Sequence, residues 1–378
     1  MKSVKYRPAQ IEIDLSAIRK NIHSLQATLE PQTDIIAVVK ANGYGHGDVQ
    51  VARAALEAGA TGLAVALLEE AIKLRESGIA APILVMGWVA PEFADIANEY
   101  GITLTVFQAS WLESYYQLSN STAKLPIHIK LDTGMGRIGI REESELNDFL
   151  GKLDQSRINV TGVYTHFATA DEEDTDYYEF QVSRFEPLLE IIKQSVKKDL
   201  TIHIGNSAVS LRHLNHLYHA VRFGIGMYGL YPSTYLKENR PFDLVPALSL
   251  KTQLSHVKRV NPGESISYGT TYKAEKHEWI GTIPIGYGDG IQRRWQNFEV
   301  LIDGKRMPLV GRICMDQCMV RLDQAYPIGT EVTFIGQQGK ESIHLEEIAT
   351  HLDTINYEVA CLLTDRLPRM YLNEKATE

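Results

Sequence analysis

The chain has 378 residues, of which 22% are charged and 44% are hydrophobic, and its formal net charge at pH 7 is −9. This composition predicts an ordered protein of one large domain or two. The negative charge and the lack of a basic stripe exclude broad binding to nucleic acid or anionic membrane. No apolar run approaches the roughly 18–20 residues that cross a bilayer, and the first residues lack the apolar core of a signal peptide, so we expect a cytoplasmic protein.

The sequence gives no metal signature. Its three cysteines are odd in number and unsuitably spaced for a zinc site, and we interpret them as reduced thiols. They are Cys314, Cys318 and Cys361. Three histidines recur at helical spacing in SLRHLNHLYHAV, and because no cysteine or acid flanks them we interpret them as a solvated helix face rather than metal ligands. They are His213, His216 and His219.

Short apolar, β-branched runs alternate with amphipathic stretches through the first two-thirds of the chain. These runs predict eight strands, at residues 35–39, 62–67, 82–86, 103–107, 127–132, 160–166, 201–205 and 220–223. The stretches at 48–59, 67–78 and 180–196 carry apolar residues three and four positions apart, which predicts helices. Eight strands that alternate with helices favour a parallel (β/α)8 barrel of the TIM type, with a doubly wound open sheet as the alternative.

The sequence pattern changes after residue 240. Residues 247–335 alternate apolar and polar positions, which predicts β-strands, and Asp303-Gly304 is a strong signal for a two-residue hairpin turn. A helix is predicted over 343–366. We therefore expect an α/β protein with a barrel domain at 1–242 and a mostly β domain at 243–378.

In such barrels, functional side chains gather at the carboxyl ends of the strands. The residues of this chain that follow predicted strands are Lys40 after the first, Arg137 after the fifth, His166 at the sixth, Asn206 and Ser207 after the seventh, and Arg222 and Gly224 at the eighth. Lys40 stands directly after IIAVV. A lysine in that position either reaches water through its long stem or stays partly dehydrated as a nucleophilic amine that condenses with an aldehyde.

The segments GNSA and FGIG have the character of a phosphate site. Barrels commonly hold a phosphate with the loops after strands seven and eight; Ser207 would donate from its hydroxyl, and Gly224 and Ile225 from their backbone. Each segment alone equally suits an ordinary chain turn. A phosphate site that faces an amine nucleophile, without metal ligands, implies a phosphorylated aldehyde, and pyridoxal 5'-phosphate fits, with Lys40 as its attachment point.

Nine segments together carry a resemblance to one family. They are AVVKANGYGHG (37–47), KLDTGMGRIG (130–139), THFATAD (165–171), HIGNSA (203–208), VRFGIGMYG (221–229), SYGTTY (267–272), IPIGYGDG (283–290), GRICMDQ (311–317) and NYE (356–358). In this order they resemble bacterial alanine racemase from the first strand to the last helix. The resemblance implies a pyridoxal-phosphate barrel, a C-terminal β domain, and a homodimer whose active sites include residues of both subunits.

The resemblance also implies catalytic roles. Lys40 would form the Schiff base with the cofactor and act as the base on one face of the substrate, and the partner subunit's Tyr268 would act on the opposite face. His166 would hydrogen-bond this tyrosine and pack against the cofactor ring, although standing alone it would be interpreted as a core histidine. Arg222, oriented by His203, would face the pyridine nitrogen and keep it unprotonated, whereas a strand-end arginine otherwise pairs with a surface acid.

Binding positions follow from the same motifs. The resemblance implies that the cofactor phosphate is held at Tyr44, Asn206, Ser207, Gly224, Ile225 and Tyr357. The substrate carboxylate would be held by Arg137, whose planar fork donates two aligned bonds, and by the backbone of the partner subunit's Met315. Lys130 lies near Arg137 in the family and would carry a carbamate that holds this arginine in place. The site entrance would be lined by Tyr287, Arg293, Arg312 and Asp316.

The implied function is that of an isomerase that interconverts L-alanine and D-alanine by a two-base mechanism through a pyridoxal-phosphate aldimine and supplies D-alanine for peptidoglycan. A racemase of another small amino acid, such as serine, is the main alternative, because one hydroxyl changes discrimination only modestly. A pyridoxal-phosphate decarboxylase would share the barrel but needs an acid where this chain has Arg222. A non-enzymatic pyridoxal-phosphate carrier would leave residues 245–378 unexplained.

Overall fold

The structure is a computed structural model that describes residues 6–214 and 217–374. Contacts between residues divide the chain into two compact units. The barrel unit holds Ala17–Gly43 and Asp48–Val245, and the β unit holds the chain through Ser16, the segment Tyr44–Gly47, and the chain from Pro246 onward. Each unit is built on a sheet of its own.

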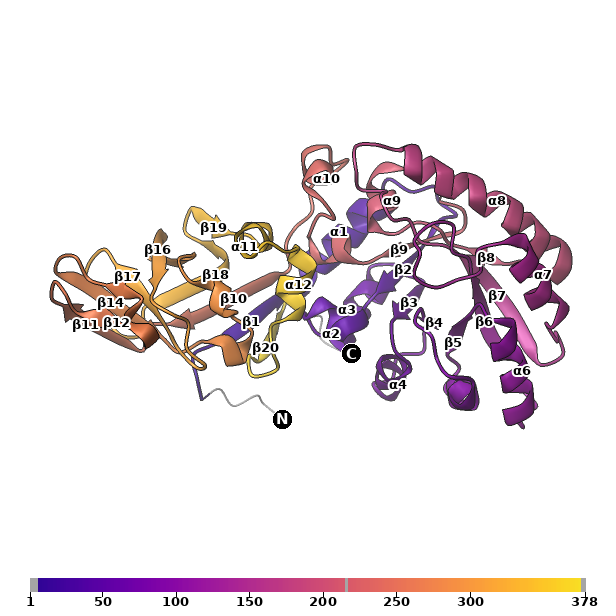
Figure 1. Ribbon diagram of the computed structural model, residues 1–378, viewed down its shortest axis with the longest axis horizontal. Helices are drawn as coiled ribbons and strands as arrows, with labels where there is room; N and C mark the ends of the chain where they lie inside the picture. The colour runs from indigo at the N-terminus through magenta and orange to yellow at the C-terminus, as the bar shows by residue number, and fades with distance from the viewer. Residues whose placement is uncertain (1–5, 215–216, 375–378) are drawn as a thin grey trace. The chain divides into compact units, whose positions relative to one another are not determined.

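Eight parallel strands form the core of the barrel unit, in the order β8-β7-β6-β5-β4-β3-β2-β9 (Figure 1). They are β2 (Asp34–Val38), β3 (Gly62–Val65), β4 (Ile83–Val85), β5 (Thr103–Val106), β6 (Leu125–Lys130), β7 (Ile158–Tyr164), β8 (Thr201–Ile202) and β9 (Ala220–Phe223). The ring closes between β8 and β9, where Gly205 and Val221 form a parallel bridge and Arg222 N donates to Gly205 O at 2.9 Å. The predicted barrel is therefore confirmed, and the open sheet is wrong.

All eight predicted strand segments overlap an observed strand. The apolar runs are buried almost without interruption, as in β3 and β4, where every residue is buried. The strands of a parallel barrel are covered on both faces, so apolar residues face both sides. This is why these segments lack the alternation of polar and apolar residues that a half-exposed strand shows. The seventh predicted segment, 201–205, forms a strand only at Thr201–Ile202.

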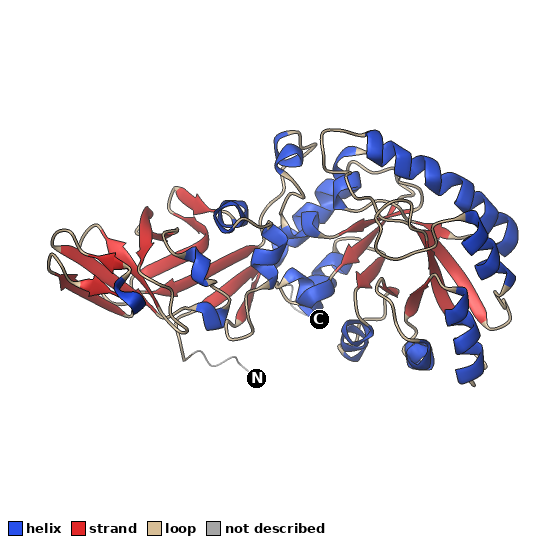
Figure 2. Cartoon of the chain, viewed as in Figure 1, coloured by secondary structure: helices blue, strands red, loops and turns tan. Residues whose placement is uncertain are grey.

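Helices surround the strands of the barrel unit (Figure 2). Among the described residues they are α1 (Leu15–Gln26), α2 (Lys40–Tyr44), α3 (Asp48–Glu57), α4 (Leu68–Glu76), η1 (Pro91–Phe93), α5 (Ala94–Glu99), α6 (Ala109–Leu118), α7 (Glu143–Gly151), α8 (Asp176–Val196), α9 (Ser207–Arg212), η3 (Ile225–Tyr228) and α10 (Thr234–Glu238). The three predicted helices are confirmed as α3, α4 and α8. In α4, Leu68, Ala71 and Leu74 recur at three-residue spacing and form the buried face.

The β unit is built on a ten-stranded sheet, in which nine strands follow the order β11-β14-β17-β16-β15-β18-β10-β1-β20 and β19 pairs with β18. The strands of the unit are β1 (Gln10–Asp14), β10 (Leu248–Gln253), β11 (His256–Val260), β12 (Ser265–Ile266), β13 (Tyr272–Lys273), β14 (Glu278–Ile283), β15 (Glu299–Ile302), β16 (Lys305–Val310), β17 (Cys318–Leu322), β18 (Glu331–Gln338), β19 (Glu341–Ile343) and β20 (Arg369–Leu372). Its short helices are η4 (Tyr268–Thr270), η5 (Tyr287–Asp289), η6 (Arg293–Trp295), α11 (Leu345–Leu352) and α12 (Asn356–Cys361).

The predicted hairpin between residues 302 and 305 is confirmed. β15 and β16 pair antiparallel with Ile302 opposite Lys305. The two turn residues, Asp303 and Gly304, have φ values of 53° and 70°. Two consecutive positive φ values match the twist of the flanking strands, which is why Asp-Gly is favoured in such turns.

Two helix predictions are wrong. The predicted helix at 343–366 is divided into α11 and α12, because Asp353 takes a left-handed backbone with φ of 56° and ends α11. The predicted histidine face is interrupted because α9 ends at Arg212. His213 instead stacks on Tyr178 with ring centroids 4.0 Å apart; His216 lies outside the described residues.

The first strand differs from the expected division of the chain at residue 242. β1 pairs with β10 antiparallel and with β20 parallel, so the beginning of the described chain belongs to the β unit. Its partners lie more than two hundred positions away, a distance over which local sequence patterns carry no information.

Among the described residues, no helix has both the length and the apolar character needed to cross a membrane.

Candidate active site

The carboxyl ends of the barrel strands bring the predicted basic residues together. Lys40 follows β2, Lys130 ends β6, His166 follows β7, and Arg222 lies in β9. Burial lowers the pKa of His166 well below its usual value, and the charges of Arg222, Lys130, Arg137 and Lys40 lower it further. Burial together with these neighbouring charges keeps the ring neutral near pH 7, so His166 can donate or accept a hydrogen bond without carrying a charge.

The turn that carries Lys40 has a left-handed backbone. Within α2, Ala41, Asn42 and Gly43 have φ values of 53°, 52° and 60°. Non-glycine residues in this region each cost roughly 1–2 kcal/mol, so the conformation needs support from outside the turn.

Glu70 of α4 supplies this support. Its Oε1 accepts a hydrogen bond from Ala41 N at 2.6 Å. Its Oε2 accepts from Ala66 N at 2.8 Å and from Leu67 N at 3.1 Å. One carboxylate thus ties the turn after β2 to the loop after β3, and it fixes the backbone from which the Lys40 side chain departs.

Arg222 is 2% exposed, and acceptors from the barrel surround its guanidinium. Nη2 donates to Thr165 O at 2.8 Å and to Ile204 O at 3.2 Å, and it lies 3.5 Å from His166 Nδ1. Nη1 donates to His203 Nδ1 at 3.0 Å and to the His203 carbonyl. Burial lowers the pKa of Arg222 to about 10, which still leaves it charged at neutral pH. Its Nε–H has no acceptor among the described residues.

Lys130 is 3% exposed, and its amine has no hydrogen-bond partner among the residues that the structure describes. The nitrogen lies over the Tyr164 ring, 4.7 Å from the centroid. Burial lowers the pKa of Lys130 well below its usual value, and Arg222 and Arg137 lower it further, against an opposing contribution from Asp132. The amine is therefore driven toward its neutral, nucleophilic form.

The GNSA segment contacts the loop after β9. Ser207 Oγ accepts hydrogen bonds from Gly224 N at 3.0 Å and from Gly226 N at 3.3 Å. Because both bonds are accepted by the oxygen, the hydroxyl proton of Ser207 points away from this loop and can be donated to a phosphate. Asn206 Oδ1 accepts from Val209 N at 3.0 Å and caps α9. The side-chain oxygen of Asn206 and the N–H of Gly224 are thus already hydrogen-bonded within the barrel unit.

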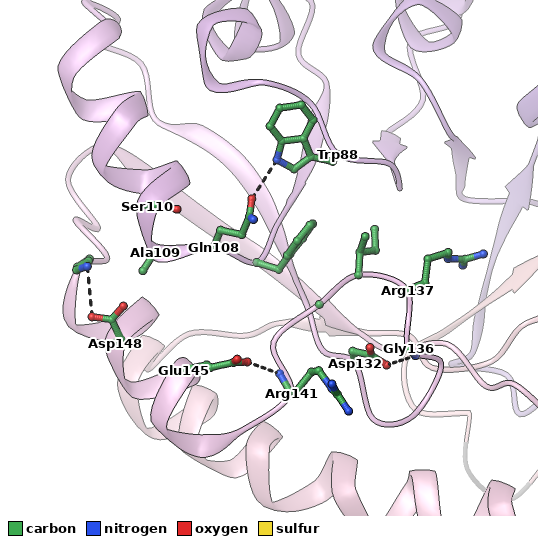
Figure 3. A pocket seen from close by; sticks show the side chains of 14 residues that line it. Trp88, Gln108, Ala109, Ser110, Asp132, Gly136, Arg137, Arg141, Glu145 and Asp148 are labelled. Atoms are coloured by element: carbon green, nitrogen blue, oxygen red, sulfur yellow. Dashed lines mark hydrogen bonds and ion pairs between the residues drawn. The ribbon is translucent and has the colours of Figure 1, made fainter.

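Arg137 borders a cavity of about 870 Å³ in the barrel unit (Figure 3). Asp132 holds the loop that carries it, because Asp132 Oδ1 accepts from Gly134 N at 3.1 Å and from Gly136 N at 3.0 Å. The cavity is also lined by Trp88, Gln108, Arg141, Glu145 and Asp148. The Arg137 side chain is exposed on this loop, where its fork can reach a carboxylate.

The β unit brings Tyr268 and Met315 into neighbouring loops. The Tyr268 side chain is 72% exposed and that of Met315 is 53% exposed. Ser267 Oγ donates to Arg312 O at 2.6 Å and lies 3.6 Å from Cys314 Sγ, so the residues that precede the two side chains contact each other. This unit therefore presents a phenol and a loop backbone side by side on its surface.

The two tyrosines predicted to contact phosphate also lie together in the β unit. The ring centroids of Tyr44 and Tyr357 are 6.1 Å apart, with an angle of 55° between the ring planes. Tyr44 is buried, with 7% of its surface exposed. Segments from opposite ends of the chain thus meet at this pair.

Three residues that hydrogen-bond to the predicted residues or to the turns that carry them were not predicted: Glu70, Asp132 and His128, whose Nδ1 lies 2.8 Å from His203 Nε2. Glu70 lies in an ordinary amphipathic helix, and nothing in the sequence distinguishes it from a surface acid. His128 precedes Lys130 by two positions in β6, which places both side chains on one face of the strand. This spacing is the signal that could have identified His128.

The residues present fit pyridoxal phosphate. The barrel offers a lysine at a strand end, a guanidinium whose Nε–H has no acceptor among the described residues, and a serine hydroxyl directed away from the loop after β9. These groups match the aldehyde, the ring nitrogen and the phosphate of the cofactor. The cluster of cationic side chains also suits an anionic cofactor and a substrate with a carboxylate.

Comparisons with known proteins agree with this geometry. Residues 13–232 match the alanine racemase N-terminal domain, and residues 247–371 match the alanine racemase C-terminal domain. An alanine racemase of Geobacillus stearothermophilus is 50% identical over 371 residues, which cover 98% of this chain and 95% of that protein. The crystal structure of alanine racemase from Bacillus anthracis with bound L-Ala-P matches with a TM-score of 0.96 and 46% identity, and the match covers 100% of this chain and 98% of the other.

The same fold also occurs in a racemase named for another amino acid. The histidine racemase of Leuconostoc mesenteroides subsp. sake matches with a TM-score of 0.88 and 31% identity, and the match covers 98% of this chain and 99% of the other. The matches to both family domains and the identity over nearly the whole chain establish the family. The chain belongs to the alanine racemase family, whose members are pyridoxal-phosphate-dependent isomerases.

Proposed function

We propose that this chain interconverts L-alanine and D-alanine, with Lys40 as the base on one face of the substrate and the partner subunit's Tyr268 as the base on the other. The observation that carries the proposal is the buried, charged guanidinium of Arg222, whose Nε–H has no acceptor among the described residues. Bound pyridoxal phosphate supplies an electron sink that acidifies the α-proton of an attached amino acid. Arg222, as a permanent cation, would disfavour protonation of a ring nitrogen that it faces and so favour return of the proton to the α-carbon over transamination.

Lys40 would bind the cofactor aldehyde and then move a proton at the α-carbon. Its backbone is held in the left-handed turn by the Ala41–Glu70 hydrogen bond of 2.6 Å. A fixed origin for a long side chain lowers the entropy that is lost when its amine is aligned with the substrate. Glu70 is therefore the support on which the position of the first base depends.

Tyr268 would exchange a proton on the opposite face. A phenol titrates near ~10, so it needs a neighbour that shares its proton if it is to act near neutrality. The neutral ring of His166, which follows β7, is suited to this task because burial and the charge of Arg222 disfavour its protonation. The 72% exposure of Tyr268 supports a role on a surface that a second subunit covers.

The substrate carboxylate would be bound from two sides. Arg137 offers two parallel N–H groups from the barrel unit. On the β unit, Met315 O already accepts from Gly288 N at 2.9 Å, so the Met315 N–H is the backbone group that remains for a carboxylate.

The cofactor phosphate would be held by the hydroxyl of Ser207, the backbone of Ile225 and the two tyrosines Tyr44 and Tyr357. Asn206 and Gly224 would shape this site rather than bind directly, because Asn206 Oδ1 and Gly224 N already bond within the barrel. The loop contacts support Ser207 as the principal donor.

Lys130 would carry a carbamate. Its neutral amine nitrogen would bond to the carbon of carbon dioxide and release one proton, leaving an anion between Arg137 and Arg222. The lowered pKa and the unpaired nitrogen support this reaction, because both a neutral nucleophile and a reason to replace a repelled cation are present. A carbamate there would hold Arg137 in its binding position.

We further propose that the protein is a cytoplasmic homodimer that supplies D-alanine for peptidoglycan, and that the boundary between its two domains along the chain lies near residue 242. The second base and the Met315 backbone would come from the partner subunit. Serine remains the principal alternative substrate. A decarboxylase is disfavoured by Arg222, and a cofactor carrier by the exposed Tyr268 and Met315.

The deciding experiment mixes the purified protein with single L-amino acids and follows optical rotation together with the cofactor spectrum. We expect L-alanine to lose rotation fastest and L-serine to follow more slowly. Loss of rotation accompanied by release of carbon dioxide would instead identify a decarboxylase, because decarboxylation also removes the chiral centre. No reaction with any amino acid would identify a carrier.

A further inference from the structure

Three side chains form a hydrogen-bonded row inside the barrel unit. Arg222 Nη1 lies 3.0 Å from His203 Nδ1, and His203 Nε2 lies 2.8 Å from His128 Nδ1. Arg222, His203 and His128 are 2%, 0% and 9% exposed. Arg222 lies in β9, His203 directly follows β8, and His128 lies in β6, so three neighbouring parts of the barrel each position one member.

The donors and acceptors in this row can be assigned. A guanidinium only donates, so His203 Nδ1 accepts and carries no proton. Burial holds the pKa of His203 well below its usual value, with further lowering by His128 and Arg222. The ring is therefore neutral, its proton is on Nε2, and it donates to His128 Nδ1. Burial and Arg222 lower the pKa of His128 to about 3, so this ring is also neutral and carries its proton on Nε2.

His203 has no favourable alternative to this arrangement. In the other tautomer, its Nδ1–H would face the N–H of Arg222, and two donors would oppose each other. Without an acceptor at position 128, the Nε2–H would be buried without a partner, which is costly. Stacking on Tyr164, with centroids 4.8 Å apart and planes 12° apart, limits rotation of the ring toward another acceptor.

Gly162 makes room for His128 on the neighbouring strand. A Cβ atom at Gly162 of β7 would lie 2.7 Å from both Nε2 and Cε1 of His128, and 2.6 Å from Thr201 O. Glycine within a strand is typical of such close approaches. The imidazole is thus held between β7 and His203, which fixes its Nδ1 in front of the His203 proton.

We propose that His128 is a positioning residue of the racemase: by accepting the Nε2 proton of His203, it holds that ring in the tautomer that binds Arg222 and so aims the guanidinium at the cofactor nitrogen. This inference rests on the proposed function in one respect, which is the role of Arg222 toward that nitrogen. The bonding within the row depends only on residues of the barrel unit. His128 itself touches neither substrate nor cofactor in this scheme.

The first test reads the tautomers directly. NMR of the holoenzyme labelled with nitrogen-15 histidine should show, near pH 7, both His203 and His128 with a protonated Nε2 and an unprotonated Nδ1. The His128 signals are assigned by their loss in His128→Asn. A protonated Nδ1 on His203 would overturn the inference, because that ring could not accept from Arg222.

The second test compares two substitutions. Asparagine can place an oxygen near the site of Nδ1 and keep an acceptor, whereas leucine has a similar branch without one. His128→Leu should lower racemisation about tenfold, the effect of losing one buried hydrogen bond, and raise transamination relative to racemisation. His128→Asn should stay within about twofold of the wild type. Equal behaviour of the two variants would contradict the inference, since acceptor chemistry would then be irrelevant.

A matched control separates positioning from general damage. Thr161→Val removes the hydrogen bond from Thr161 Oγ1 to Ile127 O in the same part of the barrel but leaves the row intact. It should leave the ratio of transamination to racemisation unchanged, and a rise equal to that of His128→Leu would overturn the inference. If His128→Leu does not fold, the tautomers and His128→Asn decide alone.

Failure of the underlying function has a different signature. If Arg222→Gln leaves the ratio of transamination to racemisation unchanged while the NMR shows the expected tautomers, the role of Arg222 at the cofactor fails, and the functional part of the inference fails with it. If Arg222→Gln changes the ratio but the tautomers differ from those expected, only the role of His128 fails.

Discussion

The two units carry reactive groups in contrasting environments. In the barrel unit, His203, Arg222 and Lys130 are at most 3% exposed, and their pKa values are lowered by burial. In the β unit, Tyr268 and Met315 are 72% and 53% exposed. Buried, interlocked groups set an electrostatic environment, whereas an exposed phenol can act only where another surface covers it. The contrast supports the proposal that the barrel unit binds the cofactor and that Tyr268 of the β unit acts in the site of a partner subunit.

The largest effect should come from removing the amine of the barrel. Lys40→Ala should abolish the absorbance of the lysine-bound cofactor and lower racemisation at least about a thousandfold, because the attachment point and one base are lost together. Spectra and optical rotation measure both quantities. Lys20→Ala, an exposed change in α1, is the control and should behave like the wild type. Activity in both directions without Lys40 would remove this residue from the mechanism.

The next effect should be one-sided, because the β unit provides only one of the two bases. Tyr268→Phe should slow exchange of the α-proton of L-alanine with solvent by about 10²–10⁴-fold while exchange of D-alanine persists. Proton NMR in heavy water measures the two rates separately. Tyr326→Phe, which removes a hydroxyl bonded to Asp323 elsewhere in the β unit, is the matched control. Equal loss for both enantiomers would contradict two opposed bases.

Reversing the charge of the buried arginine should change the partition between reactions. Arg222→Glu should favour a proton on the cofactor nitrogen, lower racemisation roughly ten- to a hundredfold and raise transamination. Separation of pyruvate and D-alanine as products gives the ratio. Arg184→Gln, which removes an ion pair with Glu142, should leave it unchanged. An unaltered ratio in Arg222→Glu would refute the electrostatic role.

A smaller effect should appear in stability. The folded state lowers the pKa of Lys130. Between the folded and the unfolded pKa the unfolded chain therefore binds more protons, and stability rises with pH across that interval. In buffer free of carbon dioxide, Lys130→Met should remove this slope and stabilise the protein at neutral pH by about 1–2 kcal/mol, since an unpaired buried amine is lost. Urea unfolding at several pH values measures the slope.

Bicarbonate should make the wild type more stable than Lys130→Met, the reverse of the order expected without carbon dioxide. The wild type should gain stability as the carbamate forms, because a ligand that binds only the folded state shifts the unfolding equilibrium, and the variant should not respond. A carbonyl signal from carbon-13 bicarbonate in the wild type, absent from Lys130→Met, would identify the adduct. A wild type insensitive to bicarbonate would exclude the carbamate.

The smallest effect concerns the left-handed turn. Ala41→Gly should change the free energy of unfolding by less than about 0.5 kcal/mol, because relief of backbone strain offsets the added freedom of the unfolded chain. Ala55→Gly in α3 is the matched control and should cost at least about 1 kcal/mol. Equal costs for both in urea unfolding would show that the turn stores no strain.

The sequence predicted the elements whose pattern is local. The strand at 35–39 is identified by five consecutive apolar residues, and the Asp303–Gly304 hairpin by turn chemistry alone. The pairing of β1 with β10 and β20 joins segments from opposite ends of the chain, and no periodicity in residues 10–14 reveals it. The predicted helix at 343–366 failed because the apolar spacing continues through Asp353, where the backbone turns left-handed.

The site divides in the same way. The sequence predicted the positions of Lys40, His166 and Arg222 because each stands at a strand end. It predicted their roles because the motifs resemble a known family. The contacts that orient them could not: Glu70 reaches Ala41 across 29 positions, and His128 reaches His203 across 75. Such contacts depend on the closure of the barrel, which no local pattern encodes.

The central claim is that one chain supplies the lysine and another supplies the tyrosine. Dimers that contain one Lys40→Ala chain and one Tyr268→Phe chain, isolated with two different affinity tags, test it directly. Each such dimer would hold one intact site, and we expect about half of the wild-type activity per dimer although both parent proteins are inactive. Activity no higher than that of the parents would contradict shared sites.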